Sequence, residues 1–399
     1  LLRKYEEECG EIPENIAMYW MASDIMWADG EQLAQILYLI GVEPVWDASG
    51  RVHSFRIIPL EELKRPRIDV TVRVSGIIRD CFYNCIEFLD RAIRAVSALE
   101  EPPSLNFLRK HAEDAERAEG VKGAGKYARI FSSKPGTYGS GVNLAVYASA
   151  WKTPKDLAEV FVVWNGYAYG ENTFGEPAHK TLKSQLKTVS ATFNKTTTDE
   201  YDMLGCCCYF STHGGLTVAA REISGKNVIA LYGDTRNEEN VEVRTLADEI
   251  RRVVRTKLLN PKWIEGMKRH GYKGAGDISK RIGRVYGWEA TTEEVDDWIF
   301  DEIARTFVLD DEMRAFFERE NPWALEEIGR RLIEAHERDL WKASEDVLDA
   351  LRSALLEVEG WMEEKMGVIE GEFQGSSIDV VTKEEVEAWK KKYEEVLRK

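Results

Sequence analysis

The side chains best suited to chemistry lie in one stretch, residues 199–215, which reads Asp-Glu-Tyr-Asp-Met-Leu-Gly-Cys-Cys-Cys-Tyr-Phe-Ser-Thr-His-Gly-Gly. Acids, thiols and aromatic residues follow one another without the apolar face of a helix or the alternation of a strand. We therefore predict a loop that positions side chains. The pair Gly214-Gly215 would permit backbone angles closed to other residues next to His213.

His213 is the sharpest candidate in this stretch. A lone histidine is more often structural, but the flanking glycines and the nearby acids Asp199, Glu200 and Asp202 favour a functional role. A neutral imidazole binds divalent metals and can also move protons near neutral pH. His213 is therefore a candidate metal ligand or proton acceptor.

The three adjacent thiols of Cys206, Cys207 and Cys208 are harder to interpret. Metal sites usually space their cysteines by two or more residues, so the spacing favours packing over metal binding. Cys81 and Cys85 lie four residues apart on one predicted helix and could meet a third thiol. The cysteines do not form a spaced disulfide framework, which makes a reducing cytoplasm the simplest setting.

Two further regions could bind anions. Residues 129–141 form a Gly-rich loop ahead of an apolar helix at 142–150, and such loops can cradle an anion with backbone N–H groups. The spacing is not that of a P-loop, and an irregular connector is an equal alternative. Lys268 and Arg269 precede His270-Gly271, which is typical of a helix C-terminus or of a basic pocket for carboxylates.

The elements around these residues predict a mixed α/β fold. Strands at 42–46, 53–58 and 68–74 alternate with helices at 31–40 and 81–99, which indicates a parallel α/β sheet in an N-terminal domain, 1–115. Arg79 and Asp80 follow the end of the 68–74 strand, where ligands gather in such sheets, although a local ion pair is the alternative.

The rest of the chain divides into three predicted regions. Residues 116–259 form a central α/β region with Gly-rich loops and a helix at 179–193, and residues 260–366 form a helical region. A polar tail with one helix follows at 367–399. Asn260-Pro261 and Asn321-Pro322 predict helix starts, and a capping box at 291–294 predicts another.

Composition narrows the function classes. The chain has 399 residues, 44% hydrophobic and 31% charged, as expected of a folded protein rather than a disordered one. A net charge of -16 argues against nucleic acid as the main partner, and no apolar run reaches the roughly 18 residues of a membrane span. The chain opens without methionine and is charged from its third residue, so we expect no signal peptide and a fragment of a longer protein.

Several stretches, taken in order, carry a family resemblance: residues 59–69, 74–80, 106–111, 129–141, 213–215, 260–275 and 321–325. Together they resemble the large subunit of cobaltochelatase (CobN) and, more distantly, the H subunit of magnesium chelatase. The resemblance covers roughly residues 10–345. Since the family's subunits are about three times longer than this chain, the resemblance implies a C-terminal part.

The resemblance implies a tetrapyrrole-binding catalytic subunit of an ATP-dependent metallochelatase, a ligase of the EC 6.6.1 type that forms metal–nitrogen bonds. Its expected partners are a ring-forming AAA+ ATPase, which binds the ATP and Mg²⁺, and an accessory subunit with a metal-adhesion-type domain. Imidazole near thiols suits cobalt or nickel better than magnesium, so cobalt is the expected metal substrate. The cysteine triplet is not a feature of the wider family.

A mechanism consistent with this resemblance assigns roles to eight residues. His213 would hold the metal or accept a pyrrole proton, and Glu200 or Asp202 would relay it. The macrocycle would be bound by the following residues: Arg79, Lys134, Lys268 and Arg269 at its carboxylates, and Tyr138 at its face. Two other classes remain open: a non-catalytic tetrapyrrole or metal carrier or scaffold, and a thiol-based metal or redox protein.

Overall fold

The computed structural model describes residues 1–120, 123–198, 200–237, 239–366 and 383–398, which form two compact units. Unit 1 comprises Leu1–Asp199, Ser211–Thr245 and Val381–Lys399, and unit 2 comprises Glu200–Phe210 and Leu246–Val380. Residues 367–382 of the predicted polar tail lie outside the described residues, as does Asp199. Among the described residues, no helix is both long and apolar enough to cross a bilayer.

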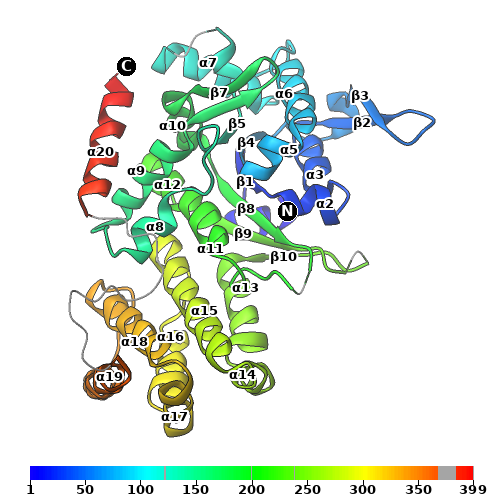
Figure 1. Ribbon diagram of the computed structural model, residues 1–399. Coiled ribbons are helices and arrows are strands. Elements are labelled where there is room, and N and C mark those ends of the chain that lie inside the picture. The colour runs from blue at the N-terminus through cyan, green and yellow to red at the C-terminus, as the bar shows by residue number, and fades with distance from the viewer. Residues whose placement is uncertain (121–122, 199, 238, 367–382, 399) are drawn as a thin grey trace. The chain divides into compact units, whose positions relative to one another are not determined.

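An eight-stranded, mostly parallel sheet organises unit 1, in the order β10-β9-β8-β1-β4-β5-β6-β7 (Figure 1). Strands β9, β8, β1, β4 and β5 are parallel, whereas β10, β6 and β7 pair antiparallel. Their bounds are β1 Asn15–Trp20, β4 Asp69–Val74, β5 Ile130–Ser132, β6 Tyr167–Gly170, β7 Thr173–Pro177, β8 Ala191–Thr196, β9 Ile229–Asp234 and β10 Glu242–Thr245. The strands predicted at 42–46 and 53–58 are present as β2 (Val42–Trp46) and β3 (Val52–Ile57), but they pair antiparallel in a separate hairpin, so their predicted place in the parallel sheet is wrong. The predicted mixed α/β fold is confirmed.

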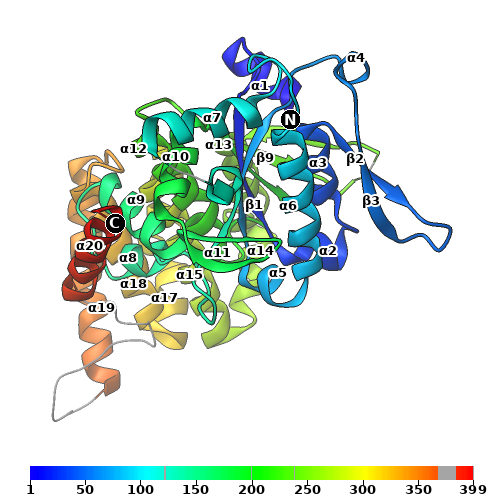
Figure 2. The ribbon, with the colours of Figure 1, turned by 90° about the horizontal axis from the view of Figure 1, so that it is seen from above.

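Helices cover both faces of this sheet. Figures 1 and 2 show α3 and α6 on one face and α9, α10 and α12 on the other, with α20 outside α9. The helices of unit 1 are α1 Leu2–Cys9, α2 Ala22–Trp27, α3 Glu31–Ile40, α4 Leu60–Leu63, α5 Gly76–Cys81, α6 Tyr83–Ser97, α7 Phe107–Glu119, η1 Gly123–Tyr127, α8 Val142–Tyr147, α9 Pro154–Asn165, α10 His179–Thr188, α12 Gly215–Ser224 and α20 Lys383–Arg398.

Strand β4 illustrates why the sequence folds this way. Its alternate positions Val70, Val72 and Val74 join the main hydrophobic core with side chains of α3 and α6. The intervening residues are polar and also buried, and they have hydrogen-bond partners inside the protein. Arg73, for example, donates to the Asn165 side chain of α9 (3.1 Å). A strand in a parallel sheet is covered on both faces, so its polar side chains must find partners inside the protein.

Unit 2 is helical. The helix α15 packs against α18, which in turn packs against α19. Its elements are α11 Cys207–Tyr209, α13 Leu246–Val253, η3 Val254–Leu258, α14 Pro261–Lys268, α15 Gly271–Thr292, α16 Asp297–Ile303, η4 Ala304–Val308, α17 Asp311–Glu320, α18 Pro322–Glu337 and α19 Glu345–Met366. The predicted caps at Asn260 and Asn321 are confirmed, because each side chain accepts a backbone N–H of the first turn.

The predicted non-helical loop at 199–215 is wrong from Cys207 onward. The chain there forms α11, then the π-helix η2 (Phe210–Gly214), then α12. Gly214 has φ −63° and ψ −43°, an ordinary helical conformation. Gly215 is required for space instead, because a Cβ there would lie 2.9 Å from Phe161 and 3.0 Å from Val142. Gly215 therefore allows close helix packing, and neither glycine makes a sharp turn.

Two predicted helix limits are also wrong. The predicted helix 179–193 ends at Thr188, and residues 191–196 form strand β8 between β1 and β9. The capping box at 291–294 marks an end rather than a start, since α15 runs to Thr292 and Glu293 takes a left-handed conformation (φ 55°). Pairing with β1 and β9 makes 191–196 a strand despite its local sequence. The helix α15 continues through the predicted start signal, because its own sequence remains helical up to that point.

Candidate functional site

The parallel strands of unit 1 end together at one edge of the sheet. The chain passes from β1 to β4 and β5 in one direction, then returns to place β8 on the other side of β1. Ligands of open α/β sheets bind beyond the carboxyl ends of the strands, where the strand order reverses. The segments that follow β1, β4, β5 and β8 therefore form the candidate site, here called the carboxyl edge.

Arg79 holds two of these segments together. It lies on α5, directly after β4, and its side chain is fully buried. Its Nη1 donates to the carbonyl oxygens of Ser133 (3.1 Å), Lys134 (3.1 Å) and Thr137 (2.9 Å). The guanidinium thus fixes the Gly-rich loop against α5. A buried guanidinium that donates to three carbonyls positions the loop, and its predicted contact with a substrate carboxylate remains a prediction.

Asp80 completes this clamp at the surface. Its Oδ1 and Oδ2 accept from Nε (2.6 Å) and Nη2 (2.8 Å) of Arg79, and Oδ2 also accepts from the Tyr138 hydroxyl (2.6 Å). These hydrogen bonds, that of Arg79 first, lower the pKa of Asp80. The Tyr138 ring lies over the Arg79 guanidinium, 5.2 Å from its carbon, and directly above Gly76, where a Cβ would meet the ring at 2.4 Å. Arg79, Tyr138 and the loop that carries Lys134 are thus brought together.

Large apolar side chains are exposed at this edge. Met26 (55% exposed) and Trp27 (56%) end α2 after β1, Ile77 (49%) lies on α5 after β4, and Tyr138 (60%) lies in the loop after β5. In both Figure 1 and Figure 2, α2 and α5 lie at the same end of the sheet. Exposed apolar and aromatic side chains that follow adjacent strands are typical of a binding surface.

A buried ion pair lies at the switch point itself. Lys195 of β8 contacts Asp24 of α2 (2.7 Å) and Glu31 of α3 (2.7 Å), and both Lys195 and Asp24 are buried. Asp24 further accepts from the Trp20 indole N–H (2.9 Å) and the Gln32 backbone N–H (2.7 Å). This arrangement fixes the start of α3 and the position of α2, which carries Trp27.

His213 lies inside unit 1 and away from solvent. Its side chain is fully buried in the π-helix η2, and Nε2 lies 3.2 Å from the Thr192 hydroxyl. Burial lowers the pKa of His213 to about 3, so the imidazole is neutral at physiological pH. A neutral imidazole can bind a metal, but this ring has no access to solvent in the described conformation. Its catalytic and metal-binding roles remain predictions.

The other predicted residues belong to unit 2. Asp202 is buried between Arg281 (3.0 Å) and Lys257 (2.8 Å); burial opposes its ionisation, but these cations lower its pKa overall. Glu200 is exposed. Lys268 ends α14 and pairs with Glu265 and Glu312, and Arg269 is the C-cap of that helix. Lys268 is therefore neutralised by two carboxylates rather than left as an open anion site.

The sequence prediction missed the residues at the carboxyl edge that follow β1 and β8. Asp24, Met26 and Trp27 were not singled out because the segment of β1 was not predicted as a strand, and Lys195 was not because the start of β8 was taken for part of a helix. Had the 191–196 segment been recognised as a parallel strand, its end and that of β1 would have identified the switch point.

Comparison with known proteins decides the family. The sequence profile of the CobN/Magnesium Chelatase family matches residues 1–348. The chain belongs to the CobN/Magnesium Chelatase family. The family resemblance predicted from the sequence is therefore confirmed.

Relatives within the CobN/Magnesium Chelatase family cover this chain almost completely. It is 60% identical over 382 residues to the uncharacterized protein MJ1441 of Methanocaldococcus jannaschii, covering 95% of this chain and 31% of that protein. It is 39% identical over 369 residues to the aerobic cobaltochelatase subunit CobN of Pseudomonas aeruginosa, covering 90% of this chain and 29% of that protein.

A solved structure agrees with these relatives. The "Catalytic Subunit of Cobaltochelatase from Mycobacterium tuberculosis" matches with a TM-score of 0.88 and 37% sequence identity, over 90% of this chain and 31% of that chain. This chain therefore spans about a third of the length of the family members that it matches.

Proposed function

We propose that this chain is the tetrapyrrole-binding part of a metallochelatase subunit, which inserts a divalent metal, cobalt in the first instance, into a corrin-type or porphyrin-type macrocycle. Metal insertion would form metal–nitrogen bonds in a ligase reaction. A separate ring-forming AAA+ ATPase would hydrolyse ATP, and a subunit with a metal-adhesion-type domain would assist it. Family membership and the geometry of the carboxyl edge support this proposal.

The observation that carries the proposal is the exposed apolar surface at the carboxyl edge. Trp27, Ile77 and Tyr138 follow three adjacent strands of the sheet. A tetrapyrrole is a broad, flat, largely apolar ring, so it would bury such side chains and stack on the aromatic ones. We place one face of the macrocycle on this surface.

Charge near this surface would orient the macrocycle. Lys134 is exposed in the Gly-rich loop, and its ammonium forms no ion pair with a described residue. Because Arg79 and Asp80 hold the loop in place, Lys134 would reach a peripheral carboxylate of the ring from a fixed position. We keep Arg79 as a positioning residue for this contact.

Insertion requires two pyrrole N–H protons to leave as the metal substrate enters the ring. We propose that His213, which burial keeps neutral, accepts a proton or holds the metal, with Glu200 and Asp202 in the relay. Because His213 lies in a π-helix, a strained form often found at functional sites, a local rearrangement of η2 is the step that would expose it.

The decisive experiment measures insertion with the complete subunit and its ATPase partners. Wild-type protein is expected to metallate a metal-free corrinoid with Co²⁺ in the presence of ATP. His213→Gln, which keeps a buried polar side chain, is expected to abolish insertion while leaving macrocycle affinity and the urea midpoint close to wild type. Wild-type turnover by this variant would remove His213 from the mechanism.

The second candidate is a non-catalytic tetrapyrrole carrier or scaffold for the ATPase. The burial of His213 and the ion pairs of Asp202 favour it, because both groups are inaccessible in the described conformation. A carrier would bind the macrocycle with the same affinity but would never metallate it when Co²⁺, ATP and partner subunits are supplied.

A further inference from the structure

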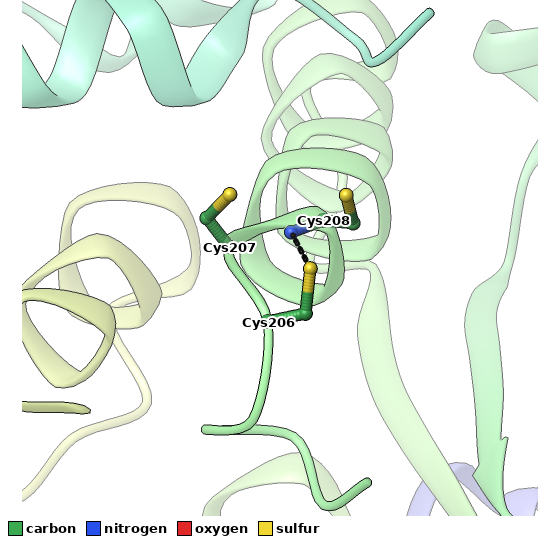
Figure 3. Close-up of side chains that lie close together, drawn as sticks. All are labelled: Cys206, Cys207 and Cys208. Atoms are coloured by element: carbon green, nitrogen blue, oxygen red, sulfur yellow. Dashed lines mark hydrogen bonds between the residues drawn. The ribbon is translucent and has the colours of Figure 1, made fainter. Parts of the chain in front are cut away.

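The cysteine triplet gathers three thiols in one turn of unit 2. The sulfur atoms of Cys206, Cys207 and Cys208 all lie within 4.8 Å of one another. Figure 3 shows the three side chains around the first turn of α11, with the Cys206 sulfur below the backbone nitrogen of Cys208. All three residues are half-buried, and none forms a disulfide.

A change of backbone conformation explains how consecutive cysteines converge. In a regular helix or strand, neighbouring side chains point in different directions, which is why adjacent cysteines seldom share a ligand. Cys206 is instead the extended N-cap of α11 (φ −144°, ψ 143°), whereas Cys207 begins the helix. Thiolate ligands that lie about 2.3 Å from a tetrahedral metal are about 3.8 Å apart. Side-chain rotations that move the sulfur atoms by roughly 1 Å would therefore bring them from within 4.8 Å to that spacing.

The surroundings of the Cys206 sulfur supply a hydrogen-bond donor and positive charge. The sulfur accepts a hydrogen bond from the Cys208 backbone N–H (3.4 Å). The positive charge of Arg284 also acts on Cys206. Arg284 donates to the Leu204 carbonyl (2.7 Å), and its buried Nε has no hydrogen-bond partner in the described part of the chain.

We propose that Cys206, Cys207 and Cys208 bind one thiophilic divalent metal ion, such as Zn²⁺ or Co²⁺, as three thiolates with a fourth position open. A divalent ion with three thiolates carries one net negative charge, which the Arg284 guanidinium offsets. Three protein ligands and an open position are typical of sites that exchange a ligand, whereas structural zinc sites have four. Thiolates select such metals over magnesium.

Packing alone does not account for this turn. Free cysteines that serve as small hydrophobic side chains are usually fully buried, whereas these three are half-buried and gather around one sulfur. The site goes beyond the proposed insertion activity, because it needs neither a tetrapyrrole nor ATP. Its test is therefore independent of that proposal.

The test is a titration of the reduced, metal-free 399-residue chain with Co²⁺ under anaerobic conditions. One equivalent is expected to produce a thiolate-to-cobalt charge-transfer absorption, and Zn²⁺ is expected to displace it. Cys207→Ser is expected to weaken Co²⁺ binding roughly 100-fold, and Arg284→Met by roughly 10-fold, without changing the cobalt-to-protein ratio at saturation.

Matched controls come from the chain itself. Cys81→Ser with Cys85→Ser removes two thiols of unit 1 and is expected to leave the absorption and affinity unchanged. The urea midpoint of each variant shows whether it folds. The proposal is overturned if the wild-type chain gives no charge-transfer absorption, or if folded Cys207→Ser binds Co²⁺ as the wild type does.

Discussion

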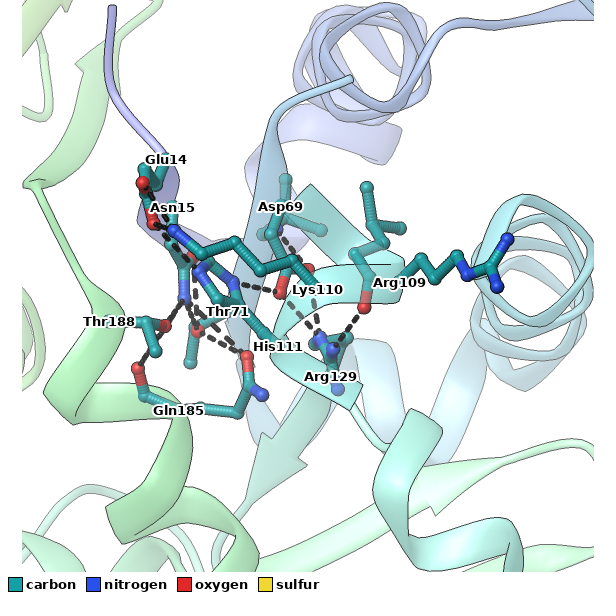
Figure 4. A network of polar contacts seen from close by, with 12 residues as sticks. Glu14, Asn15, Asp69, Thr71, Arg109, Lys110, His111, Arg129, Gln185 and Thr188 are labelled. Atoms are coloured by element: carbon teal, nitrogen blue, oxygen red, sulfur yellow. Dashed lines mark hydrogen bonds and ion pairs between the residues drawn. The ribbon is translucent and has the colours of Figure 1, made fainter. Parts of the chain in front are cut away.

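The amino ends and the carboxyl ends of the parallel strands differ in how far their side chains are exposed to solvent. At the amino ends of β1 and β4, Asn15 and Asp69 are buried in a hydrogen-bonded network with side chains of α7 and α10 (Figure 4). At the carboxyl ends, Arg79 is also buried, but it holds an exposed loop and lies beneath an exposed aromatic ring. The first end has its polar groups satisfied inside the protein, and the second leaves large apolar and aromatic side chains exposed.

Asp69 shows how complete the amino-end network is. It accepts from Arg129 Nε (2.8 Å), and its other oxygen lies 2.9 Å from His111 Nδ1. His111 in turn contacts Glu14 (3.1 Å). Because both Asp69 and Arg129 have no exposed surface, loss of Arg129 leaves the buried Asp69 without its guanidinium partner. We infer from this difference that the buried network at the amino end stabilises the fold, and we propose that the exposed side chains at the carboxyl end bind the macrocycle.

The largest effect should come from breaking the amino end. Arg129→Ala is expected to lower the free energy of unfolding by about 3–5 kcal/mol, because Asp69 then lies buried without its partner. Urea denaturation measures this loss. Arg117→Ala, which removes an exposed cation, is the control and should change stability by less than about 0.5 kcal/mol. Similar losses in the two variants would refute the structural role of the network.

Stability should also depend on pH through the amino end. Hydrogen bonding to His111 and Lys110 lowers the pKa of Glu14 from 4.5 to about 2, so its contribution is lost as pH falls below 4.5. Burial opposes protonation of His111, but Asp69 and Glu14 raise its pKa above 6.5, so its contribution is present below 6.5 and lost as pH rises through the raised value. His111→Gln should cost about 1–2 kcal/mol at pH 6 and remove the alkaline decline. An unchanged alkaline limb in its urea midpoints would contradict this assignment.

A smaller effect should follow from Gly76→Ala at the carboxyl end. The added Cβ would displace the Tyr138 ring, which is exposed and can move. Stability should change by less than about 1 kcal/mol, whereas affinity for metal-free uroporphyrin should fall roughly 3- to 10-fold. Gly136→Ala is a poor control because of its positive φ, so Gly266→Ala, a helical glycine with open space, serves instead. If Gly76→Ala bound uroporphyrin as tightly as Gly266→Ala does, the result would contradict the assignment of Tyr138 to the binding surface.

The smallest effect should come from Lys134→Ala. An exposed ammonium contributes only about 0.5–1 kcal/mol to a carboxylate contact, and salt screens it. Uroporphyrin affinity should therefore fall roughly 2- to 5-fold at low ionic strength and match wild type at 1 M salt. A loss that persists at high salt would indicate that Lys134 acts through loop structure rather than charge.

The sequence predicts strands β2, β3 and β4 but not how strands pair, because β2 and β3 form a hairpin outside the main sheet. Strand β4 is recognisable from its alternating valines, and Asn260 and Asn321 are recognisable as caps because those signals are local. Strand β8 is not, since its identity depends on pairing with β1 and β9. Spacing rules likewise miss the convergence of Cys206 with its neighbours, which depends on an extended cap residue.

The candidate site was predicted only where local sequence signals mark its residues. Arg79 and Tyr138 were recognised from a strand end and a Gly-rich loop, and the structure places them in contact. Trp27 and Lys195 were not, because their position beside the switch point depends on strand order. The burial of His213 could not be predicted from its neighbours in sequence. A glycine such as Gly215 occurs both in turns and where helices pack closely, and the sequence alone does not distinguish the two.

The most direct measurement of the difference between the two ends is a titration of the Trp27→Ala/Tyr138→Ala variant with metal-free uroporphyrin. Truncation of two exposed aromatic side chains should weaken binding roughly 10- to 100-fold while the urea midpoint stays within error of wild type. A wild-type dissociation constant for this variant, with its fold intact, would contradict the assignment of the carboxyl edge as the macrocycle-binding surface.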